Sequence, residues 1–416
     1  MATRIRYMGN KHDVAPYVAA IVEEEASNRA FVDAFSGMCS VAGAISKSGR
    51  RVVCNDIQGY AALVARCLIA TAEPAPTPSR LREALAGPYQ YNRSRLVSYL
   101  GAEVAEEDRV LADLNLESYQ SAYTAWRHTA NDGEVAEELK DFSEATGAAR
   151  YCLASLTFAW GYFGLRQAIA IDSIRYAIDR AREDESLSDA HCDWALVALL
   201  QAASCASASP GHFAQYLRPT TESGFRRILS QRRRNIWSQF LHEASLLRAY
   251  GSREWRKMNA VLQADALALG EKLDGLNIKS AVIYADPPYS TDHYSRYYHV
   301  LETLYLYDFP SAEGAGRYRP DRFPTPFSIK TKVEKAMTEF CREIAARDFT
   351  LVLSYPSNGL LNKTCNVDLT EFLGLHFNEV ELRADLSTRH STLGARHGAA
   401  SNPVAEMLWV ARSSRN

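Results

Sequence analysis

Residues 281–289 read AVIYADPPY, and the interpretation of the whole chain begins at this stretch. Its first five residues are apolar and include β-branched and aromatic types, which predicts a short buried strand. Asp286 and the two prolines end the strand, because proline cannot donate to a sheet ladder and fixes its own φ. We therefore expect a carboxylate, a stiffly held carbonyl at Pro287 and the ring of Tyr289 at the carboxyl end of a strand, where open α/β sheets bind ligands.

The chemistry that this turn offers is recognition of an amino group on a planar ring. Asp286 and the carbonyl of Pro287 are two neighbouring hydrogen-bond acceptors, and Tyr289 offers an aromatic face for stacking. Acceptors on both amine hydrogens favour a pyramidal nitrogen, whose lone pair is less delocalised into the ring. The alternative is a Pro-Pro turn with a capping Asp and no ligand, and the tetrapeptide alone does not decide between the two.

The composition is that of an ordinary globular protein. The 416 residues are 47% hydrophobic and 23% charged, which allows two or three domains. The net charge of −2 gives no overall signal for nucleic acid, so any basic surface has to be local. The eight cysteines are scattered without a Cys-x-x-Cys pair, which favours reduced thiols in a cytoplasmic protein. No run approaches about 18 apolar residues, so we expect no membrane span.

A glycine loop after an early strand predicts a cofactor site. Residues 30–35 form a strand pattern, and the small residues of 36–40, which include Gly37, precede a helical pattern. A second strand pattern ends at Asp56. Asp56 follows Asp33 by 23 positions, close to the spacing of about 20 residues at which an acid binds ribose hydroxyls. These features indicate an α/β domain with an adenosine-containing cofactor, with an unrelated βαβ unit as the alternative. A further strand pattern ends at Asp265, whose carboxylate suits an adenine amine.

A long helical block interrupts this alternating pattern. A Pro-rich stretch at 73–79 marks the boundary, after which the chain reads as mainly helical to about residue 255. We predict three parts: 1–72 is the first part of a catalytic domain, 73–255 is a helical insert, and 256–416 is the second part of the catalytic domain.

Basic residues gather near the end of the helical block. Between residues 211 and 260, ten Arg or Lys face three Glu, a net charge of +7, with aromatic side chains interleaved. Contacts to a phosphate backbone require such a composition, although a solvated helix face gives the same pattern. A loop of small residues at 387–403 adds further arginines. The predicted nucleic-acid contacts are Arg232, Arg233, Arg234, Arg389 and Arg396.

Together these motifs resemble the Dam-type N6-adenine DNA methyltransferases, whose catalytic motif reads DPPY. The shared motifs, in the order of that family, are Asp33-Ala-Phe-Ser-Gly37, the acid at Asp56, Ala264-Asp265 and Asp286-Pro-Pro-Tyr289. Arg6-Tyr-Met-Gly-Asn-Lys11 resembles the N-terminal cofactor motif, and Tyr297-Tyr-His-Val-Leu-Glu302 resembles the segment after the catalytic motif. The resemblance covers 1–70 and 255–411. The helical block matches by position alone, where that family keeps its target-recognition domain.

The resemblance implies a Rossmann-like α/β sheet that binds S-adenosylmethionine, with DNA as substrate and adenine N6 as methyl acceptor. Asp286 and the Pro287 carbonyl would hold the amine, and Tyr289 would stack on the flipped base. The implied cofactor residues are Tyr7 and Lys11 over its carboxylate, Asp33, Ala34, Phe35 and Gly37 along its methionine end, Asp56 on its ribose and Asp265 on its adenine amine. No metal is required.

The sequence departs from the family pattern at Cys39, which replaces the second glycine of Phe-x-Gly-x-Gly and predicts a loop farther from the cofactor. Cytosine N4 and adenine in RNA stay open as acceptors, although Asp rather than Ser at position 286 favours adenine. A catalytically inert DNA-binding subunit is a further alternative. Restriction or phage-defence partner proteins would suit such a chain, and its target sequence follows from no pattern in the residues.

Overall fold

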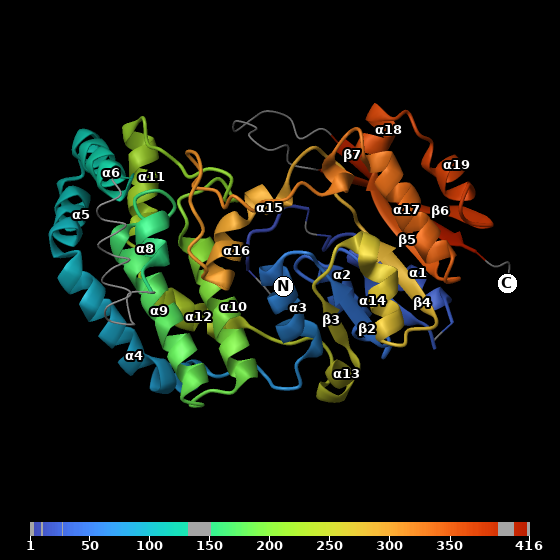
Figure 1. The fold of residues 1–416 in the computed structure, drawn as a ribbon, viewed down its shortest axis with the longest axis horizontal. Helices are drawn as coiled ribbons and strands as arrows, with labels where there is room; N and C mark the ends of the chain where they lie inside the picture. The colour runs from blue at the N-terminus through green and yellow to red at the C-terminus, as the bar shows by residue number, and fades with distance from the viewer. Residues whose placement is uncertain (1–3, 10, 27, 132–150, 390–402, 414–416) are drawn as a thin grey trace. The chain divides into compact units, whose positions relative to one another are not determined.

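The computed structural model describes residues 4–9, 11–26, 28–131, 151–389 and 403–413. The chain divides into two compact units, which we call the sheet unit and the helical unit (Figure 1). The sheet unit comprises Tyr7–Ala72, Ala249–Ser295 and Phe323–Asn416. The helical unit comprises Met1–Arg6, Glu73–Arg248 and Arg296–Arg322.

The limits of these units differ from the predicted division in three places. Residues 249–255, expected in the helical insert, belong to the sheet unit. Met1–Arg6 and Arg296–Arg322, expected in the first and the second catalytic part, belong to the helical unit. His299 shows why the second of these segments packs there. Its side chain is fully buried, and its Nε2 lies 3.0 Å from the carbonyl oxygen of Phe213, whose own N–H donates to the carbonyl of Tyr297.

The sheet unit is built on seven strands in the order β3-β2-β1-β4-β5-β7-β6. In chain order the strands are β1 (Ala30–Asp33), β2 (Val52–Asn55), β3 (Ala260–Leu262), β4 (Ala281–Ala285), β5 (Thr350–Pro356), β6 (Glu379–Arg389) and β7 (Pro403–Arg412). The strands from β3 to β5 are parallel, and β7 lies antiparallel between β5 and β6. The α/β class expected from the sequence is confirmed.

The central strands read as continuous apolar runs because both of their faces are covered. Every residue of β1, β4 and β5 is buried. One face packs against α14 (Leu269–Gly275), α17 (Val333–Ala345), α18 (Leu360–Thr364) and α19 (Leu369–Gly374), and Figure 1 shows α14 and α17 in front of the strands. α2 (Ser40–Ile45) packs against β1 and β2, α3 (Gly59–Ala65) packs against β2 and β3, and α1 (Ala15–Glu24) packs on α2.

Short elements complete the sheet unit. They are the π-helix η1 (Arg66–Ala70), α13 (Arg253–Met258), the 3-10 helices η2 (Ala266–Ala268) and η3 (Pro326–Ser328), and the start of α15 (Tyr294–Tyr297).

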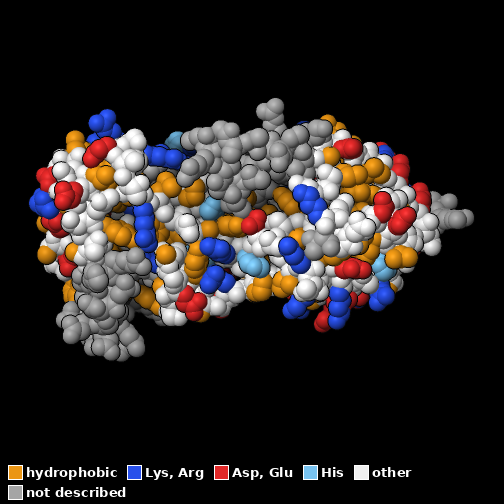
Figure 2. All heavy atoms as spheres, turned by 90° about the horizontal axis from the view of Figure 1, so that it is seen from above, with side chains coloured by type: hydrophobic (Ala, Val, Ile, Leu, Met, Phe, Trp, Pro, Cys, Tyr) orange, Lys and Arg blue, Asp and Glu red, His pale blue; other side chains and the backbone are white. Residues whose placement is uncertain are grey.

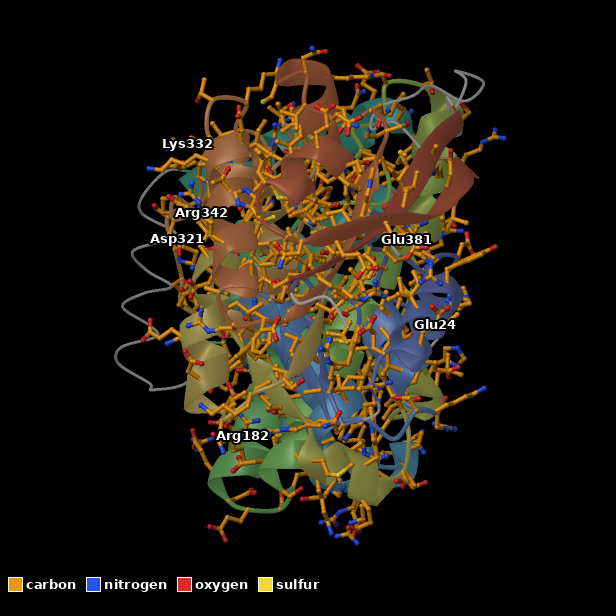
Figure 3. All side chains as sticks on the ribbon, turned by 90° about the vertical axis from the view of Figure 1, so that its right-hand side faces the viewer. Glu24, Arg182, Asp321, Lys332, Arg342 and Glu381 are labelled. Atoms are coloured by element: carbon orange, nitrogen blue, oxygen red, sulfur yellow. The ribbon has the colours of Figure 1, made fainter. Side chains whose placement is uncertain are left out.

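Charged side chains tie the edge strand β6 to α1. A terminal nitrogen of Arg383 lies 2.7 Å from the carboxylate of Glu24, and its Nε lies 3.4 Å from Glu381. Figure 3 shows Glu24 and Glu381 on the same side of the molecule. Charges of this kind protect an edge strand, whose free backbone groups would otherwise pair with another chain.

The secondary-structure elements in the described part of the helical unit are helices, as the sequence predicts for residues 73–255. These are α4 (Pro78–Tyr99), α5 (Gly101–Asp113), α6 (Leu116–Asn131), α8 (Leu153–Thr157), α9 (Leu165–Glu183), α10 (Asp189–Ala206), α11 (Glu222–Arg232), α12 (Ile236–Leu246) and α16 (His299–Leu306). Thr77, Ser188, Thr221 and Asn235 begin four of them by accepting a backbone N–H of the first turn. In the described part of the chain, no helix is long and apolar enough to cross a membrane.

Candidate active site

The crevice at the carboxyl ends of β1 and β4 holds the predicted site. β2 and β3 lie on one side of β1, and β4 lies on the other side. The strand order therefore reverses here, which makes this crevice a topological switch point. A pocket of about 930 Å3, open to solvent, lies here. Nine of the predicted residues line it, namely Tyr7, Lys11, Asp33, Phe35, Gly37, Asp56, Asp286, Pro287 and Tyr289.

Two predicted cofactor residues do not line this pocket. Ala34 is buried, and its N–H continues the sheet by donating to the Tyr284 carbonyl at 2.9 Å. β3 ends at Leu262, before Asp265, whose carboxylate caps η2 by accepting the N–H of Leu267 at 2.9 Å. A contact between Asp265 and a ligand amine stays a prediction.

The loop between β1 and α2 brings Asp56 to the pocket. Gly37 has φ +44° and donates its N–H to Asp56 Oδ2 at 3.0 Å, while Gln58 donates its N–H to Oδ1 at 2.9 Å. These two amides orient the carboxylate. A Cβ on Gly37 would lie 3.0–3.2 Å from ring atoms and the hydroxyl of Tyr7, so glycine is needed for this close approach.

Cys39, the departure from the family pattern, has the left-handed φ of +59° that glycine adopts most easily. Its side chain is fully buried and interacts with Cys54 beneath the loop. The neighbouring residues Met38 and Ser40 line the pocket, whereas Cys39 does not. The thiol therefore lies behind the loop and takes no space from the pocket.

Asp33 is a buried acid at the end of β1, with 2% of its surface exposed. Burial, followed by the charges of Asp286 and Asp56, raises the pKa of its carboxyl group to about 8, against hydrogen bonds from two backbone amides that lower it. Asp33 therefore carries its proton at neutral pH, and a cation in the pocket would favour its loss.

Lys11 contacts two carboxylates of the protein. Its Nζ lies 3.1 Å from Asp286 Oδ1 and 2.6 Å from Glu406 Oε1. The contact with a cofactor carboxylate that the resemblance implies stays a prediction. Burial lowers the pKa of Lys11, and the two carboxylates outweigh this effect, so that the pKa is raised. Lys11 thus stays charged inside the protein.

Asp286 and Tyr289 follow β4 as the sequence predicts. The side chain of Asp286 is 16% exposed, and the ring of Tyr289 is half-buried, with its centroid 5.5 Å from Lys11 Nζ. Burial raises the pKa of the Tyr289 hydroxyl to about 12, so it remains neutral. The pocket therefore presents the carboxylate of Asp286, the neutral phenol of Tyr289 and the Pro287 carbonyl close together in the chain.

Sequence reasoning missed several pocket residues. Tyr294 packs its ring 5.9 Å from that of Tyr7, and its hydroxyl would lie 3.1 Å from a Cβ on Gly9, whose φ is +72°. His293 also lines the pocket. Glu406, fully buried in β7, was not predicted either. The signal in the sequence that could have revealed it is the position of a single acid inside the apolar pattern 403–411.

The residues predicted to contact nucleic acid differ in their burial and in their hydrogen-bond partners. Arg232 is buried, and its guanidinium donates to the carbonyls of Trp160 and Gly161, so its assignment as a phosphate contact is wrong. Arg234 donates to the Cys205 carbonyl at 2.5 Å, and Arg233 is exposed. Only the backbone of Arg389 is described, and Arg396 lies outside the described residues. Figure 2 shows basic and acidic side chains interspersed over the described part of the face that it presents.

No cluster of three His, Cys, Asp or Glu side chains suited to a metal ion occurs within the ranges that the structure describes.

Comparisons with known proteins identify relatives. Type II methyltransferase M.FokI of Planomicrobium okeanokoites is 27% identical over 201 residues, which are 48% of this chain and 27% of that protein. Modification methylase LlaI of Lactococcus lactis subsp. lactis is 22% identical over 370 residues, 88% of this chain and 48% of that protein. Type II methyltransferase M.CviAII of Paramecium bursaria Chlorella virus 1 is 25% identical over 249 residues, 60% of this chain and 65% of that protein. The chain thus spans less than two thirds of each of these relatives.

No solved structure matches the chain significantly. The family model described as D12 class N6 adenine-specific DNA methyltransferase matches residues 7–223 and 229–354, which is most of the chain. This match confirms the resemblance drawn from the motifs. The chain belongs to the D12 class N6 adenine-specific DNA methyltransferase family.

Proposed function

We infer that this chain is a site-specific DNA methyltransferase that transfers a methyl group from S-adenosylmethionine to N6 of an adenine extruded from the duplex. The observation that carries this conclusion is the meeting of two motifs in one pocket. The glycine loop with Asp56 lines one part of the pocket, and Asp286, Pro287 and Tyr289 line another. A methyl donor and an amine acceptor bound there would be neighbours.

The pocket residues fit the donor. Asp56 is held by two backbone amides and suits a ribose diol, and Gly37 leaves room where a side chain would clash. Phe35 offers an apolar surface, and Asp33 and Asp286 place acidic groups where a sulfonium cation would be favoured. When bound, the donor supplies an electrophilic methyl group, so the protein has to position it and the amine rather than activate a nucleophile through a metal.

The acceptor side of the pocket holds and orients an amine. Asp286 and the Pro287 carbonyl each accept one amine hydrogen, which directs the nitrogen lone pair away from the ring plane. Tyr289 stacks on the extruded base and offsets part of the few kcal/mol that flipping costs. Asp286 also takes up the proton that N6 loses once it is methylated. Positioning and two hydrogen bonds account for most of the catalysis.

The fold supports the same proposal. A mostly parallel sheet with a ligand crevice at β1 and β4 suits a Rossmann-like methyltransferase domain, and the helical unit, which enters the chain after Ala72, suits a target-recognition domain. Arg233 is the described arginine among the predicted contacts that stays exposed for phosphate.

The test is methyl transfer by the purified protein to genomic DNA and to total RNA, followed by mass analysis of the nucleosides. We expect N6-methyladenine from DNA and none from RNA. Asp286→Ala should lower the rate by at least about 100-fold, because it removes a preorganised acceptor. Its affinity for S-adenosylmethionine, measured by calorimetry, should stay close to that of the wild type. N4-methylcytosine as product, or near wild-type transfer by Asp286→Ala, contradicts the proposal.

A further inference from the structure

A fully buried carboxylate sits two strands away from the catalytic turn. Glu406 belongs to β7, where it pairs with Pro356 of β5, and none of its surface is exposed. Burying a carboxylate costs several kcal/mol unless partners compensate for the lost water. Two partners meet Glu406 Oε1: Lys11 Nζ lies 2.6 Å away, and the Ser354 hydroxyl donates a short hydrogen bond. The strand interior thus holds a charged acceptor aimed at Lys11.

Lys11 connects this acceptor to the catalytic carboxylate. Its backbone carbonyl accepts the N–H groups of Val14 and Ala15 at 3.1 and 2.8 Å, which fixes the residue at the start of α1. Its side chain is 7% exposed, so its ammonium group has few solvent contacts. The ammonium group lies 3.1 Å from Asp286 Oδ1 and 2.6 Å from Glu406 Oε1. One cation is therefore shared by two carboxylates, one in the turn after β4 and one in β7.

The contact covers one oxygen of Asp286. Oδ1, which faces Lys11, is buried, while the side chain as a whole keeps 16% of its surface exposed and lines the pocket. Asp286 is close enough to Asp33 for its charge to raise the pKa of that buried acid. Lys11 offsets the charge of Asp286 and holds its carboxylate in one orientation.

We propose that Glu406, with Ser354 behind it, is a positioning residue that holds Lys11 against Asp286, so that Lys11 orients the catalytic carboxylate instead of binding the cofactor. This inference rests on the proposed function and assigns a role in it to Glu406 and Ser354, which lie outside the family motifs discussed above. The chain of contacts joins β5, β7 and the start of α1 to the turn after β4. Rigid elements of the sheet thereby fix a group on a short turn.

The test is steady-state methylation by Glu406→Gln and Lys11→Met across a pH series, with Glu25→Gln as the matched control. Glu25 is a buried glutamate of the same unit that pairs with Arg412 at 2.7 Å and does not line the pocket. We expect Glu406→Gln to lower kcat by about 10- to 100-fold, because small misplacement of a reacting group has effects of this size. The KM values for DNA and S-adenosylmethionine should change by less than about threefold, since neither ligand loses a contact.

The pH profile separates positioning from simple loss of structure. Without the Lys11 cation, Asp286 holds its proton to higher pH, so the acid limb of kcat moves up in Lys11→Met. Without the competing Glu406 charge, Lys11 acts on Asp286 alone, so the acid limb moves down in Glu406→Gln. A purely structural role moves neither limb. Circular dichroism and calorimetric S-adenosylmethionine binding verify that each variant is folded. If Glu406→Gln does not fold, Glu406→Asp serves as a second variant.

Three outcomes overturn the proposal. Glu406→Gln with wild-type kcat shows that Glu406 does not act on Asp286, and acid limbs that do not move show a structural role only. A raised KM for S-adenosylmethionine in Lys11→Met at unchanged kcat returns Lys11 to the cofactor carboxylate. These results require an active wild-type protein, whereas an inactive wild type contradicts the proposed function instead.

Discussion

At the scale of single residues, the proton on Asp33 sets the charge of the pocket. Its pKa is raised from an ordinary 3.8 to about 8 by burial and by neighbouring acids, so the folded protein binds this proton more tightly than the unfolded chain. The contribution of this group to stability is fully present below its unfolded pKa of 3.8. It is lost progressively as pH rises through about 8.

Two measurements check this titration. The denaturant midpoint should fall between about pH 4 and pH 8 and level off above, and Asp33→Asn should flatten that dependence because the amide does not titrate. Binding of a sulfonium cofactor at about pH 7.5 should release a fraction of a proton, which calorimetry in buffers of different ionisation enthalpy detects. Wild type and Asp33→Asn with identical pH dependence would exclude Asp33 as the titrating group.

At the scale of elements, the loop between β1 and α2 depends on Gly37 for two separate reasons. Its φ of +44° disfavours any side chain, and a Cβ would also press on Tyr7. Gly49, after α2, has φ +71°, but a Cβ added there would meet no atom within 4 Å. Gly49 therefore shares the positive φ of Gly37 but not its crowding. The two glycines therefore separate backbone strain from crowding in the pocket.

We expect Gly37→Ala and Gly49→Ala each to cost about 1 kcal/mol or somewhat more in unfolding free energy, because both place alanine at positive φ. Gly37→Ala should also weaken S-adenosylmethionine binding by about tenfold or more, as Tyr7 is displaced and the amide that holds Asp56 shifts. Chemical denaturation and calorimetry give the two quantities. Equal cofactor affinity in both variants would show that the loop tolerates a side chain at Gly37.

At the scale of the whole molecule, adjacent arginines at the end of α11 serve different ends. Arg232 binds two carbonyls inside the helical unit and neutralises the buried Glu107, whose carboxylate accepts the N–H groups of Leu165 and Arg166 at the start of α9. Arg233 faces solvent. The first therefore supports the fold, and the second is available to a nucleic acid.

Arg232→Ala should destabilise the protein by roughly 3 kcal/mol or more, because it leaves the Glu107 carboxylate buried without its cation. Arg233→Ala should leave stability nearly unchanged, weaken DNA binding, and reduce the salt dependence of binding by about one phosphate contact. Thermal unfolding and DNA-binding titrations at several salt concentrations measure these effects. Unchanged DNA affinity in Arg233→Ala would show that Arg233, at the end of α11, does not contact DNA.

The features that the sequence predicted well are local. The run at 281–285, the proline turn at Asp286 and the small-residue loop at Gly37 depend on neighbouring residues, so their patterns are visible in the chain. Their meeting in one pocket followed from the rule that parallel strands place ligands at their carboxyl ends.

The features that the sequence did not predict depend on distant partners. The role that we propose for Glu406 depends on its contact with Lys11, which lies near the other end of the chain. Arg232 looked like a surface cation because a run of arginines does not reveal which side chain turns inward. The segment 296–322 joins the helical unit through contacts such as that of His299 with Phe213, which no local pattern contains.

The order in which the strands appear along the chain has a consequence for synthesis. β1 and β4 are neighbours, with Ala30 paired to Ala281, yet the residues of the helical unit from Glu73 to Arg248 are made between them. A ribosome needs on the order of ten to fifty seconds for that interval. During this time the apolar edge of β1 has no partner strand on that side, so the nascent protein is expected to depend on chaperones until β4 emerges.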